Sequence, residues 1–312
     1  MDSPLVSVII VTYNSDKYII ETLESVKNQI YPNIELIVTD DFSSDNTVNL
    51  CKDWLTNNES RFVHCHLEKS AINTGVAPNA NRGIKKCTGV WVKILAGDDI
   101  LLPNCIKDNI EYVRTRENVK VLFSKMIPFV IRDNIMVKSD SKPSSCDIDF
   151  FSLSIEDKIH KLLFRNLLPA PTSFILLSIL TMYPYNEEFP FMEDYPEWIN
   201  LLSHGVDFSF LAKETVLYRL SESSISSVAC SFYPHRMAKS YYLFYYKVLI
   251  NLFSEKDEDA YRKVRKRMFM VSFADAFLSN NRSSLFNRFL YRFISILVNR
   301  FSHFNFDREN RI

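Results

Sequence analysis

Two adjacent carboxylates, Asp98 and Asp99, follow an apolar run and a glycine in the segment 94–103. Adjacent carboxylates repel each other, so a pair at the end of a strand calls for a compensating cation. A divalent metal that also binds a phosphate is the usual one, because hard cations prefer oxygen ligands. The alternative is an aspartate-rich turn that caps a helix starting at Pro103. This segment by itself does not decide between the two.

The glycines of the chain gather next to the same pair. Only five glycines occur in 312 residues, and four of them are Gly75, Gly83, Gly89 and Gly97. Glycine permits tight turns and close approach of the backbone. A glycine-poor chain that concentrates its glycines here favours a ligand site over a simple helix cap.

Three apolar, β-branched runs precede residues that could bind a ligand. The runs span 5–12, 34–39 and 90–95, and they are typical of strands buried on both faces. Helices are expected between them, and this alternation predicts an α/β fold with a mostly parallel sheet. Ligands of such sheets lie beyond the carboxyl ends of the strands. The residues that follow the runs should therefore meet at one edge: Tyr13 and Asn14, Asp40 and Asp41, Asp98 and Asp99.

The remaining elements follow from hydrophobic periodicity and turn residues. In the first hundred residues we expect helices over 16–29, 44–55 and 75–86, and a strand over 61–67. Beyond them we expect helices over 103–116 and 193–202, and strands over 119–123, 127–131, 135–138, 206–213 and 215–219. Asp133-Asn134 has the composition of a hairpin turn. From residue 231 onward the pattern is mainly helical.

The length of 312 residues indicates one large domain, or one domain with an extension, and 47% hydrophobic residues are enough for a sizeable core. The six cysteines have no short paired spacing, so we expect reduced cytosolic thiols rather than a disulfide frame or a zinc site. The segment His64-Cys65-His66 could suggest metal ligands. It lies in an expected strand, where neighbours point to opposite faces, so packing is the favoured interpretation.

The net charge of zero is unevenly distributed. From Cys230 onward there are fifteen Lys and Arg against seven Asp and Glu, a net charge of +8, so the first 229 residues carry −8. We therefore divide the chain into an acidic domain (1–229) and a basic helical extension (230–312). A basic surface suits phosphates of lipid headgroups or of nucleic acid. No apolar run is long enough for a spanning helix.

The segment 284–302 separates on a helical wheel into a polar side with two arginines and an aromatic-rich apolar side. This pattern fits a helix that lies in a membrane interface. Packing on the domain 1–229 or on another subunit is the alternative. The basic cluster 262–267 could attract anionic lipid, and no recognition motif accompanies it that would indicate nucleic acid.

Taken together, the motifs resemble those of the inverting glycosyltransferases of family 2, which have the GT-A fold, and in particular the bacterial polysaccharide and O-antigen type. Each motif is weak alone, but all occur in order at the expected spacing across roughly residues 4–225. The resembling segments are Val6–Asn14, Glu35–Thr47, Asn73–Gly75, Asn81–Ile84 with Gly89, Leu95–Asp99 and Met192–Tyr195.

The resemblance implies a GT-A catalytic domain over 1–229, with a nucleotide-binding half (1–102) and an acceptor half (103–229). It also implies a nucleotide-sugar donor bound by Thr12, Tyr13, Asn14, Asp41, Arg82, Asp98 and Arg219. Tyr13 would stack on the base and Asp41 would accept a hydrogen bond from the base edge, while Asp40 supports the turn. Core filling by Tyr13 and helix capping by Asp41 are the alternatives. Asp99 would ligate Mn²⁺ or Mg²⁺, and Asp98 would hold the ribose or the water shell of the metal.

The resemblance also places Glu193-Asp194 on the acceptor side. Inversion needs one base that takes the proton of the attacking hydroxyl, and Asp194 is the candidate, with Glu193 binding the acceptor. The alternative is that both acids simply favour a helix N-terminus.

Two positions depart from the family pattern. Ala96 stands where many members have another Asp, which weakens the expected metal site. Ser221 stands where many members have His, in a segment expected to close over the diphosphate. Arg219, just before it, would contact phosphate or pair with the acidic body.

We therefore expect a metal-dependent glycosyltransferase at the cytoplasmic face of the membrane, peripherally bound through its C-terminal helices. It would move a hexose from a UDP-sugar to a polyprenyl-diphosphate-linked glycan during O-antigen or capsule synthesis. It would bind no nucleic acid and could be a homo-oligomer. The rivals are a nucleotidyltransferase, which usually has a glycine-rich phosphate loop after the first strand, and a non-catalytic interaction protein, which would be expected to have lost some of the acidic residues.

Overall fold

A computed structural model of the chain describes residues 3–163, 165–189, 191–220, 235–249, 258–277 and 284–300. The chain forms two compact units, Met1–Ser221 and Glu222–Ile312. The boundary expected at residue 229 lies outside the described residues and stays a prediction.

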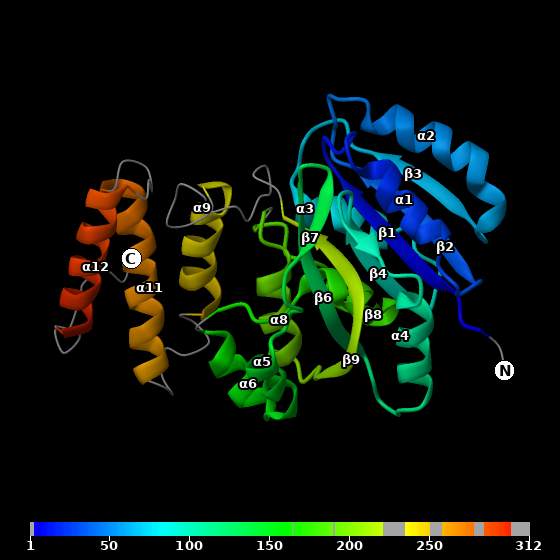
Figure 1. Ribbon diagram of the computed structural model, residues 1–312. Helices are drawn as coiled ribbons and strands as arrows, with labels where there is room; N and C mark the ends of the chain where they lie inside the picture. Colours follow the sequence, from blue (N-terminus) through cyan, green and yellow to red (C-terminus); the bar gives the residue numbers. More distant parts are fainter. Residues whose placement is uncertain are drawn as a thin grey trace. The chain divides into compact units, whose positions relative to one another are not determined.

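Unit 1 contains a mixed sheet with flanking helices (Figure 1), in the order β3-β2-β1-β4-β8-β6-β9-β5. Its first four strands are parallel: β1 (Val6–Thr12), β2 (Ile34–Asp40), β3 (Cys65–Lys69) and β4 (Trp91–Ala96). The other strands are β5 (Ile100–Leu101), β6 (Val121–Arg132), β7 (Ile135–Lys138), β8 (Phe174–Leu176) and β9 (Phe208–Arg219). Among these, β8 joins β4 and β6 in antiparallel fashion, while β6 and β9 are parallel. The expected α/β class is confirmed, and the sheet is parallel mainly in its first half.

The α-helices of unit 1 are α1 (Ile19–Lys27), α2 (Thr47–Asn58), α3 (Val76–Ile84), α4 (Cys105–Arg114), α5 (Ser145–Ile148), α6 (Ile155–Leu162), α7 (Leu177–Met182) and α8 (Asp194–Ser203). The five predicted helices of unit 1 are present as α1, α2, α3, α4 and α8, whereas α5, α6 and α7 were not predicted. Short 3₁₀ turns are η1 (Glu59–Arg61), η2 (Asp149–Ser152) and η3 (Ala170–Thr172).

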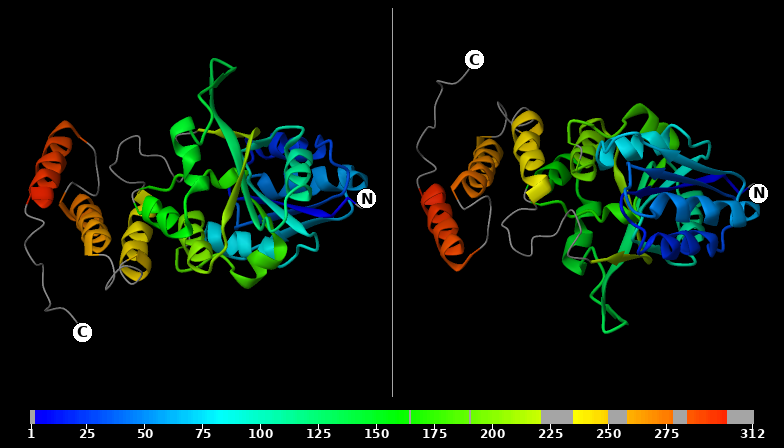
Figure 2. Two further views of the ribbon diagram at one scale, coloured as in Figure 1. Left: turned by 90° about the horizontal axis from the view of Figure 1, so that it is seen from below. Right: turned by 90° about the horizontal axis from the view of Figure 1, so that it is seen from above.

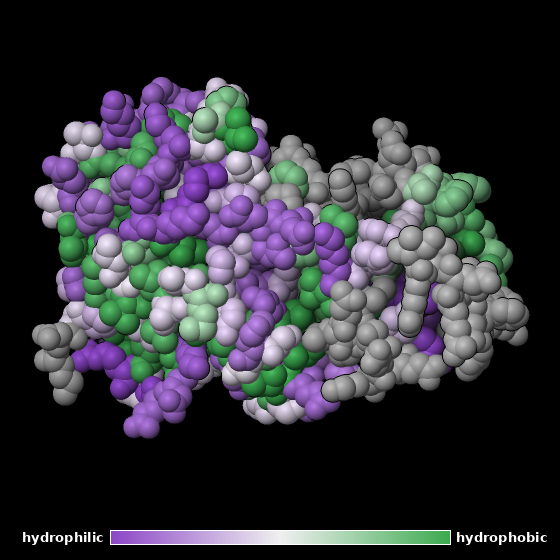
Figure 3. Space-filling model, turned by 180° about the vertical axis from the view of Figure 1, so that it is seen from behind, coloured by the Kyte–Doolittle hydropathy of each residue, from purple (hydrophilic) through white to green (hydrophobic). Residues whose placement is uncertain are grey.

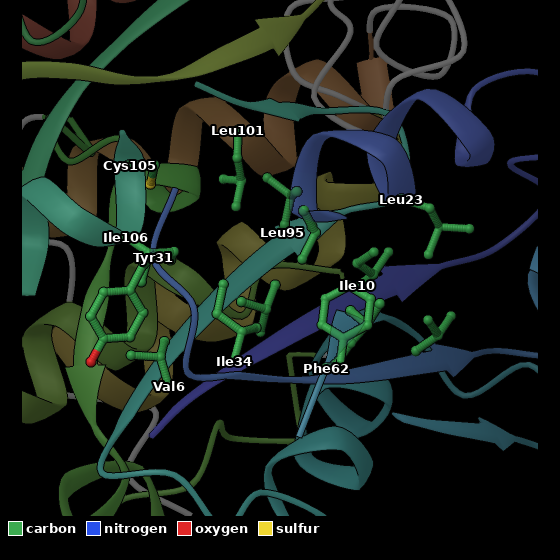
Figure 4. Packing of buried hydrophobic residues seen from close by; sticks show 14 of the residues in the cluster. Val6, Ile10, Leu23, Tyr31, Ile34, Phe62, Leu95, Leu101, Cys105 and Ile106 are labelled. Carbon is green, nitrogen blue, oxygen red and sulfur yellow. The ribbon is translucent and has the colours of Figure 1, made fainter. Parts of the chain in front are cut away.

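The core lies between the parallel strands and the helices that cover them. Val6 and Ile10 of β1 pack with Leu23 of α1 and Leu95 of β4 (Figure 4). Each fully buried aliphatic side chain contributes about 1.5–3 kcal/mol of stability. On the other face of β1, a Cβ at Gly83 of α3 would lie 2.6 Å from Cγ2 of Ile9, so the close packing of α3 on the sheet requires glycine there.

The buried carboxylate of Glu35 binds the turn that precedes β4. Glu35 accepts hydrogen bonds from the Ser7 hydroxyl (2.5 Å), from the amide (2.6 Å) and hydroxyl (2.7 Å) of Thr88, and from the amide of Gly89 (3.0 Å). Burial alone would raise the pKa of Glu35, but these hydrogen bonds together hold it below its usual value. Glu35 therefore ties β2 to the turn that starts the fourth strand.

Three expected boundaries differ from the structure, each for a local reason. The strand expected over 61–67 starts at Cys65, because Arg61 lies in η1 and donates to the carbonyls of Lys27, Gln29, Pro32 and Tyr31. The strands expected over 119–123 and 127–131 are one bulged strand, β6, and those over 206–213 and 215–219 are one strand, β9. The pairing of β6 with β9 continues on both sides of the expected breaks, so each pair of expected strands forms a single strand.

The predicted Asp133-Asn134 turn is present, with both residues at positive φ, and it joins β6 to β7. Figure 2 shows this hairpin extending away from the rest of unit 1. On the face drawn in Figure 3, hydrophobic residues reach the surface as patches among hydrophilic ones.

Unit 2 is helical where it is described, as expected from residue 231 onward. It contains α9 (His235–Phe244), a π-helical turn η4 (Tyr245–Leu249), α11 (Glu258–Phe277) and α12 (Leu285–Arg300). In the parts of both units that the structure describes, no helix is long and apolar enough to cross a membrane.

Candidate active site

The carboxyl ends of β1, β2 and β4 lie in register at one edge of the sheet. Thr12 pairs with Asp40, and Val11 pairs with Ala96. The residues that follow these strands therefore begin at the same level of the sheet. This edge brings together Tyr13 and Asn14, Asp41, and the Gly97–Asp99 turn.

Asp99 is a fully buried carboxylate at this edge. Its Oδ1 accepts a hydrogen bond of 2.9 Å from the backbone amide of Arg219, and its Oδ2 has no partner among the described residues. Burial raises the pKa of Asp99 well above its usual value, and the neighbouring charge of Asp98 raises it further. A cation at Oδ2 would relieve both effects.

Asp98 is partly buried beside it. Burial raises the pKa of Asp98, and the nearby Arg219 guanidinium opposes that rise. Gly97 allows the turn to lie against β1, because a Cβ there would come within 2.8 Å of Thr12 Oγ1 and 3.0 Å of Ser15 Oγ. Thr12 Oγ1 is itself buried without a partner in the described part of the chain.

Asp41 is almost fully buried and is bound within the protein. It accepts hydrogen bonds from the hydroxyl (2.7 Å) and amide (2.9 Å) of Thr74, from the amide of Gly75 (2.6 Å) and from Arg82 Nη2 (2.7 Å). This network holds the loop before α3. The base contact expected of Asp41 and the donor contact expected of Arg82 stay predictions.

Tyr13 and Asn14 follow β1 with different surroundings. The Tyr13 side chain is 43% exposed, so its ring is accessible for stacking. Asn14 has φ 49°; its amide donates to Ser43 Oγ (2.8 Å) and its Oδ1 accepts from the amide of Ser44 (2.8 Å). Asn14 thus links the loops that follow β1 and β2.

Asp40 supports the turn after β2, as expected. Its Oδ1 accepts a hydrogen bond of 2.9 Å from the amide of Ser43, and its Oδ2 accepts one from the hydroxyl of the same residue.

Arg219 is only 4% exposed and binds protein groups. Its Nε donates to the carbonyl of Asp98 (2.9 Å), and its Nη2 pairs with the carboxylate of Glu21. The phosphate contact expected of this side chain is not tested by these contacts.

The second acidic group lies at the start of α8. Asp194 Oδ2 accepts a hydrogen bond of 2.6 Å from Asn166 Nδ2. Burial raises the pKa of Asp194, while the amide of Tyr195 and the side chain of Asn166 oppose the rise. Burial and then the charge of Asp194 raise the pKa of Glu193 to about 8. The two acids therefore titrate as a pair, and the hydrogen bond from Asn166 favours the charged form of Asp194.

Sequence reasoning missed Glu197, one helical turn after Asp194. This residue is 1% exposed, its Oε1 has no partner among the described residues, and burial raises its pKa to about 8. The available signal was its place among Trp198, Ile199 and Leu201, since an acid within an apolar run is expected to be buried.

The donor set at Asp98 and Asp99 suits a hard divalent cation, because it offers carboxylate oxygens and one of them, Asp99 Oδ2, is a buried acceptor without a described partner. No group of three or more His, Cys, Asp and Glu that could hold a metal occurs in the described ranges, including His64–His66. A bound cation would therefore take its other ligands from phosphate oxygens and water.

A hollow of about 620 Å³ lies elsewhere in unit 1, between α4, β6 and β9. None of the predicted site residues lines it, and two ion pairs lie within it, Lys213 with Asp108 at 2.5 Å and Lys107 with Glu111 at 3.8 Å. We therefore place the candidate site at the sheet edge and at α8 instead.

The C-terminal helix α12 exposes a stripe of large apolar side chains. Phe286, Phe289, Phe293 and Ile296 are between 49% and 72% exposed. Their spacing of three and four residues places them along one face of the helix. This is the apolar side that the sequence pattern predicts.

The chain is similar to known proteins in both sequence and structure. The family model described as "Glycosyl transferase family 2" matches residues 7–169, which is more than half of the chain. The curated E. coli protein WfgD, described as a UDP-Glc:alpha-D-GlcNAc-diphosphoundecaprenol beta-1,3-glucosyltransferase, is 28% identical over 271 residues, which cover 80% of this chain and 94% of WfgD.

Two solved structures share the fold. S. aureus TarS 1–349 in complex with UDP-GlcNAc has a TM-score of 0.60 and 21% identity, covering 86% of this chain and 73% of that one. The mannosyltransferase PcManGT from Pyrobaculum calidifontis, in complex with GDP-Man and Mn²⁺, has a TM-score of 0.55 and 15% identity, covering 97% and 84%.

Proposed function

The chain belongs to glycosyltransferase family 2, and on that premise we propose that it moves a hexose from a UDP-sugar to a hydroxyl of a lipid-linked glycan in O-antigen or capsule synthesis. The observation that carries the proposal is Asp99, a buried carboxylate with an unpartnered Oδ2 at the edge where three parallel strands end. Family membership favours a glycosyltransferase over a nucleotidyltransferase or a non-catalytic protein.

The proposed donor site is the sheet edge formed by Thr12, Tyr13, Asn14, Asp41, Arg82 and Asp98. Tyr13 would stack on the base, and the exposure of its ring supports this role. The Asp41 network of Thr74, Gly75 and Arg82 shapes the neighbouring loop. UDP is the proposed nucleotide because WfgD is described as using UDP-Glc and TarS was solved with UDP-GlcNAc.

Asp99 and Asp98 are the residues that would hold a divalent metal, which we propose to be Mn²⁺ or Mg²⁺. When bound, such an ion stabilises the charge that accumulates on the leaving nucleoside diphosphate without a proton donor. The absence of a third acid at Ala96 leaves Asp99 as the main protein ligand. PcManGT, which was solved with Mn²⁺, supports the choice of ion.

Asp194 is the proposed base. It takes the proton of the acceptor hydroxyl as that oxygen attacks the anomeric carbon, and the configuration inverts because attack comes opposite to the leaving group. Glu193 retains a proton up to a pKa of about 8 and can donate a hydrogen bond to the acceptor. Asn166 holds the Asp194 carboxylate in place.

The proposed acceptor is a polyprenyl-diphosphate-linked glycan, since WfgD is described by such an acceptor. The exposed apolar stripe of α12 supports binding at the cytoplasmic surface of the membrane, where that acceptor would be reached. Association with a second copy through the same stripe is the alternative.

A thermal-shift series tests the proposal. A UDP-sugar with Mn²⁺ is expected to raise the melting temperature more than either component alone, because ligands that bind the native state stabilise it. GDP-sugars are the control for the choice of nucleotide. No response to any nucleotide sugar, with or without Mn²⁺, would contradict the proposal.

A further inference from the structure

The guanidinium of Arg219 is held between two parts of unit 1. Its Nε donates to the carbonyl of Asp98 at 2.9 Å, and its Nη2 pairs with Glu21 in the first turn of α1. Arg219 is 4% exposed, whereas the Glu21 side chain is 49% exposed. The fork of the arginine therefore connects the Gly97–Asp99 turn to α1.

Two aromatic rings fix the plane of the same guanidinium. Its central carbon lies 4.2 Å from the ring centroid of Tyr18 and 4.6 Å from that of Phe129. Tyr18 precedes α1, and Phe129 is the partner of Arg219 in the β6–β9 pairing. Stacking on aromatic rings favours the planar guanidinium over a lysine ammonium.

The backbone of Arg219 holds the other half of the acidic pair. Its amide donates to Asp99 Oδ1 at 2.9 Å, and two residues earlier Leu217 pairs with Ile100 of β5. One residue thus binds the backbone of Asp98 and the carboxylate of Asp99. Since Oδ1 is bound in this way, Oδ2 is the oxygen left for a ligand.

We propose that Arg219 is a positioning residue for the Asp98–Asp99 turn, and that Glu21 anchors it, rather than that Arg219 binds the donor diphosphate. The inference rests on the proposed function, in which Asp99 Oδ2 binds the metal. Groups that orient metal ligands commonly change metal affinity about 10–100-fold when they are removed. Glu21, far from the acidic pair in the sequence, thereby becomes part of the donor site's support.

The two roles of Arg219 predict opposite effects of Glu21→Gln. If Arg219 binds phosphate, Glu21 competes with phosphate for the guanidinium, so removing its charge should tighten UDP binding. If Arg219 positions the turn, the loss of the anchor should weaken Mn²⁺-dependent UDP binding, by about tenfold. Arg219→Lys keeps the charge but loses the fork, and it should weaken binding at least as much.

The experiment measures UDP affinity by calorimetry with and without Mn²⁺ for the wild type, E21Q, R219K and the double variant. Glu111→Gln is the matched control, because Glu111 is also an exposed helical glutamate that pairs with a basic side chain, Lys107, at 3.8 Å. We expect E111Q to bind UDP like the wild type. We expect the double variant to bind UDP no more weakly than R219K, since E21Q and R219K disrupt the same contact between Arg219 and Glu21.

Tighter or unchanged binding by E21Q, or additive losses in the double variant, would overturn the proposal. If R219K fails to fold in a circular dichroism melt, the direction of the E21Q effect decides alone. Wild-type protein that shows no Mn²⁺-dependent UDP binding would instead contradict the proposed function, so the two failures are distinguishable.

Discussion

The side-chain amide of Asn166 donates a hydrogen bond of 2.6 Å to Oδ2 of Asp194, the first residue of α8. The bond favours the ionised carboxylate at a position where burial disfavours it. An ionised and oriented carboxylate is the state that a base requires.

Replacing the base tests this assignment. Asp194→Asn keeps the shape of the side chain but cannot accept the proton, so kcat should fall by about 10²–10⁴. UDP affinity should stay within about twofold, because Asp194 belongs to the acceptor side of the proposed site. Steady-state kinetics and calorimetry check both statements, and an unchanged kcat would remove Asp194 from this role.

The pH dependence of turnover should have an alkaline limb set by Glu193. As pH rises through its pKa of about 8, Glu193 loses its proton and can no longer donate to the acceptor, so kcat should fall. Glu193→Gln stays neutral at every pH and should abolish that limb. An identical alkaline limb in the variant would assign it to another group.

Glu35 should stabilise the fold at neutral pH and not in acid. Its pKa is lowered in the folded state, so its contribution is present above its usual pKa and is lost as pH falls through the folded value. Glu35→Gln should cost about 1–3 kcal/mol at pH 7, because buried donors lose a charged acceptor. Urea unfolding should show a smaller difference from the wild type at pH 4; Glu111→Gln is the exposed control. An equal loss at both pH values would show that the carboxylate charge is not involved.

The apolar stripe of α12 should bind membranes. Replacing Phe286 and Phe289, which are 72% and 70% exposed, with serine should reduce co-sedimentation with vesicles containing anionic lipid. Replacing the polar-side Tyr291 with serine is the matched control and should have little effect. If the stripe instead joins two copies, the double variant would change the mass in solution while vesicle binding stayed the same.

The sheet edge proposed for the donor could be predicted from the sequence because Tyr13, Asp41 and the Gly97–Asp99 turn come directly after strands. Apolar runs locate the ends of β1, β2 and β4, and parallel pairing then brings Tyr13, Asp41 and Asp98 to one edge. The roles of Glu21 and Asn166 could not be predicted in this way. They depend on contacts across 198 and 28 residues, and side-chain periodicity carries no information about such partners.

Element boundaries differed for the same reason. The side chain of Arg61 caps carbonyls at the end of α1 and delays the third strand to Cys65. The pairing of β6 with β9 merges strands that looked separate in the sequence. The burial of Glu197 could not be predicted for the same reason, because the packing of other elements against α8 decides which of its residues are buried.

Asp99 Oδ2 is the proposed metal ligand of the nucleotide-sugar site. The most direct measurement is calorimetric titration of UDP-glucose into the wild type and Asp99→Asn, each with and without Mn²⁺. The asparagine keeps an acceptor for the Arg219 amide and removes a charge that burial disfavours, so the fold should be retained. We predict Mn²⁺-dependent binding in the wild type and a loss of at least about tenfold in the variant. Equal affinity in all four titrations would contradict the role of Asp99 as a metal ligand.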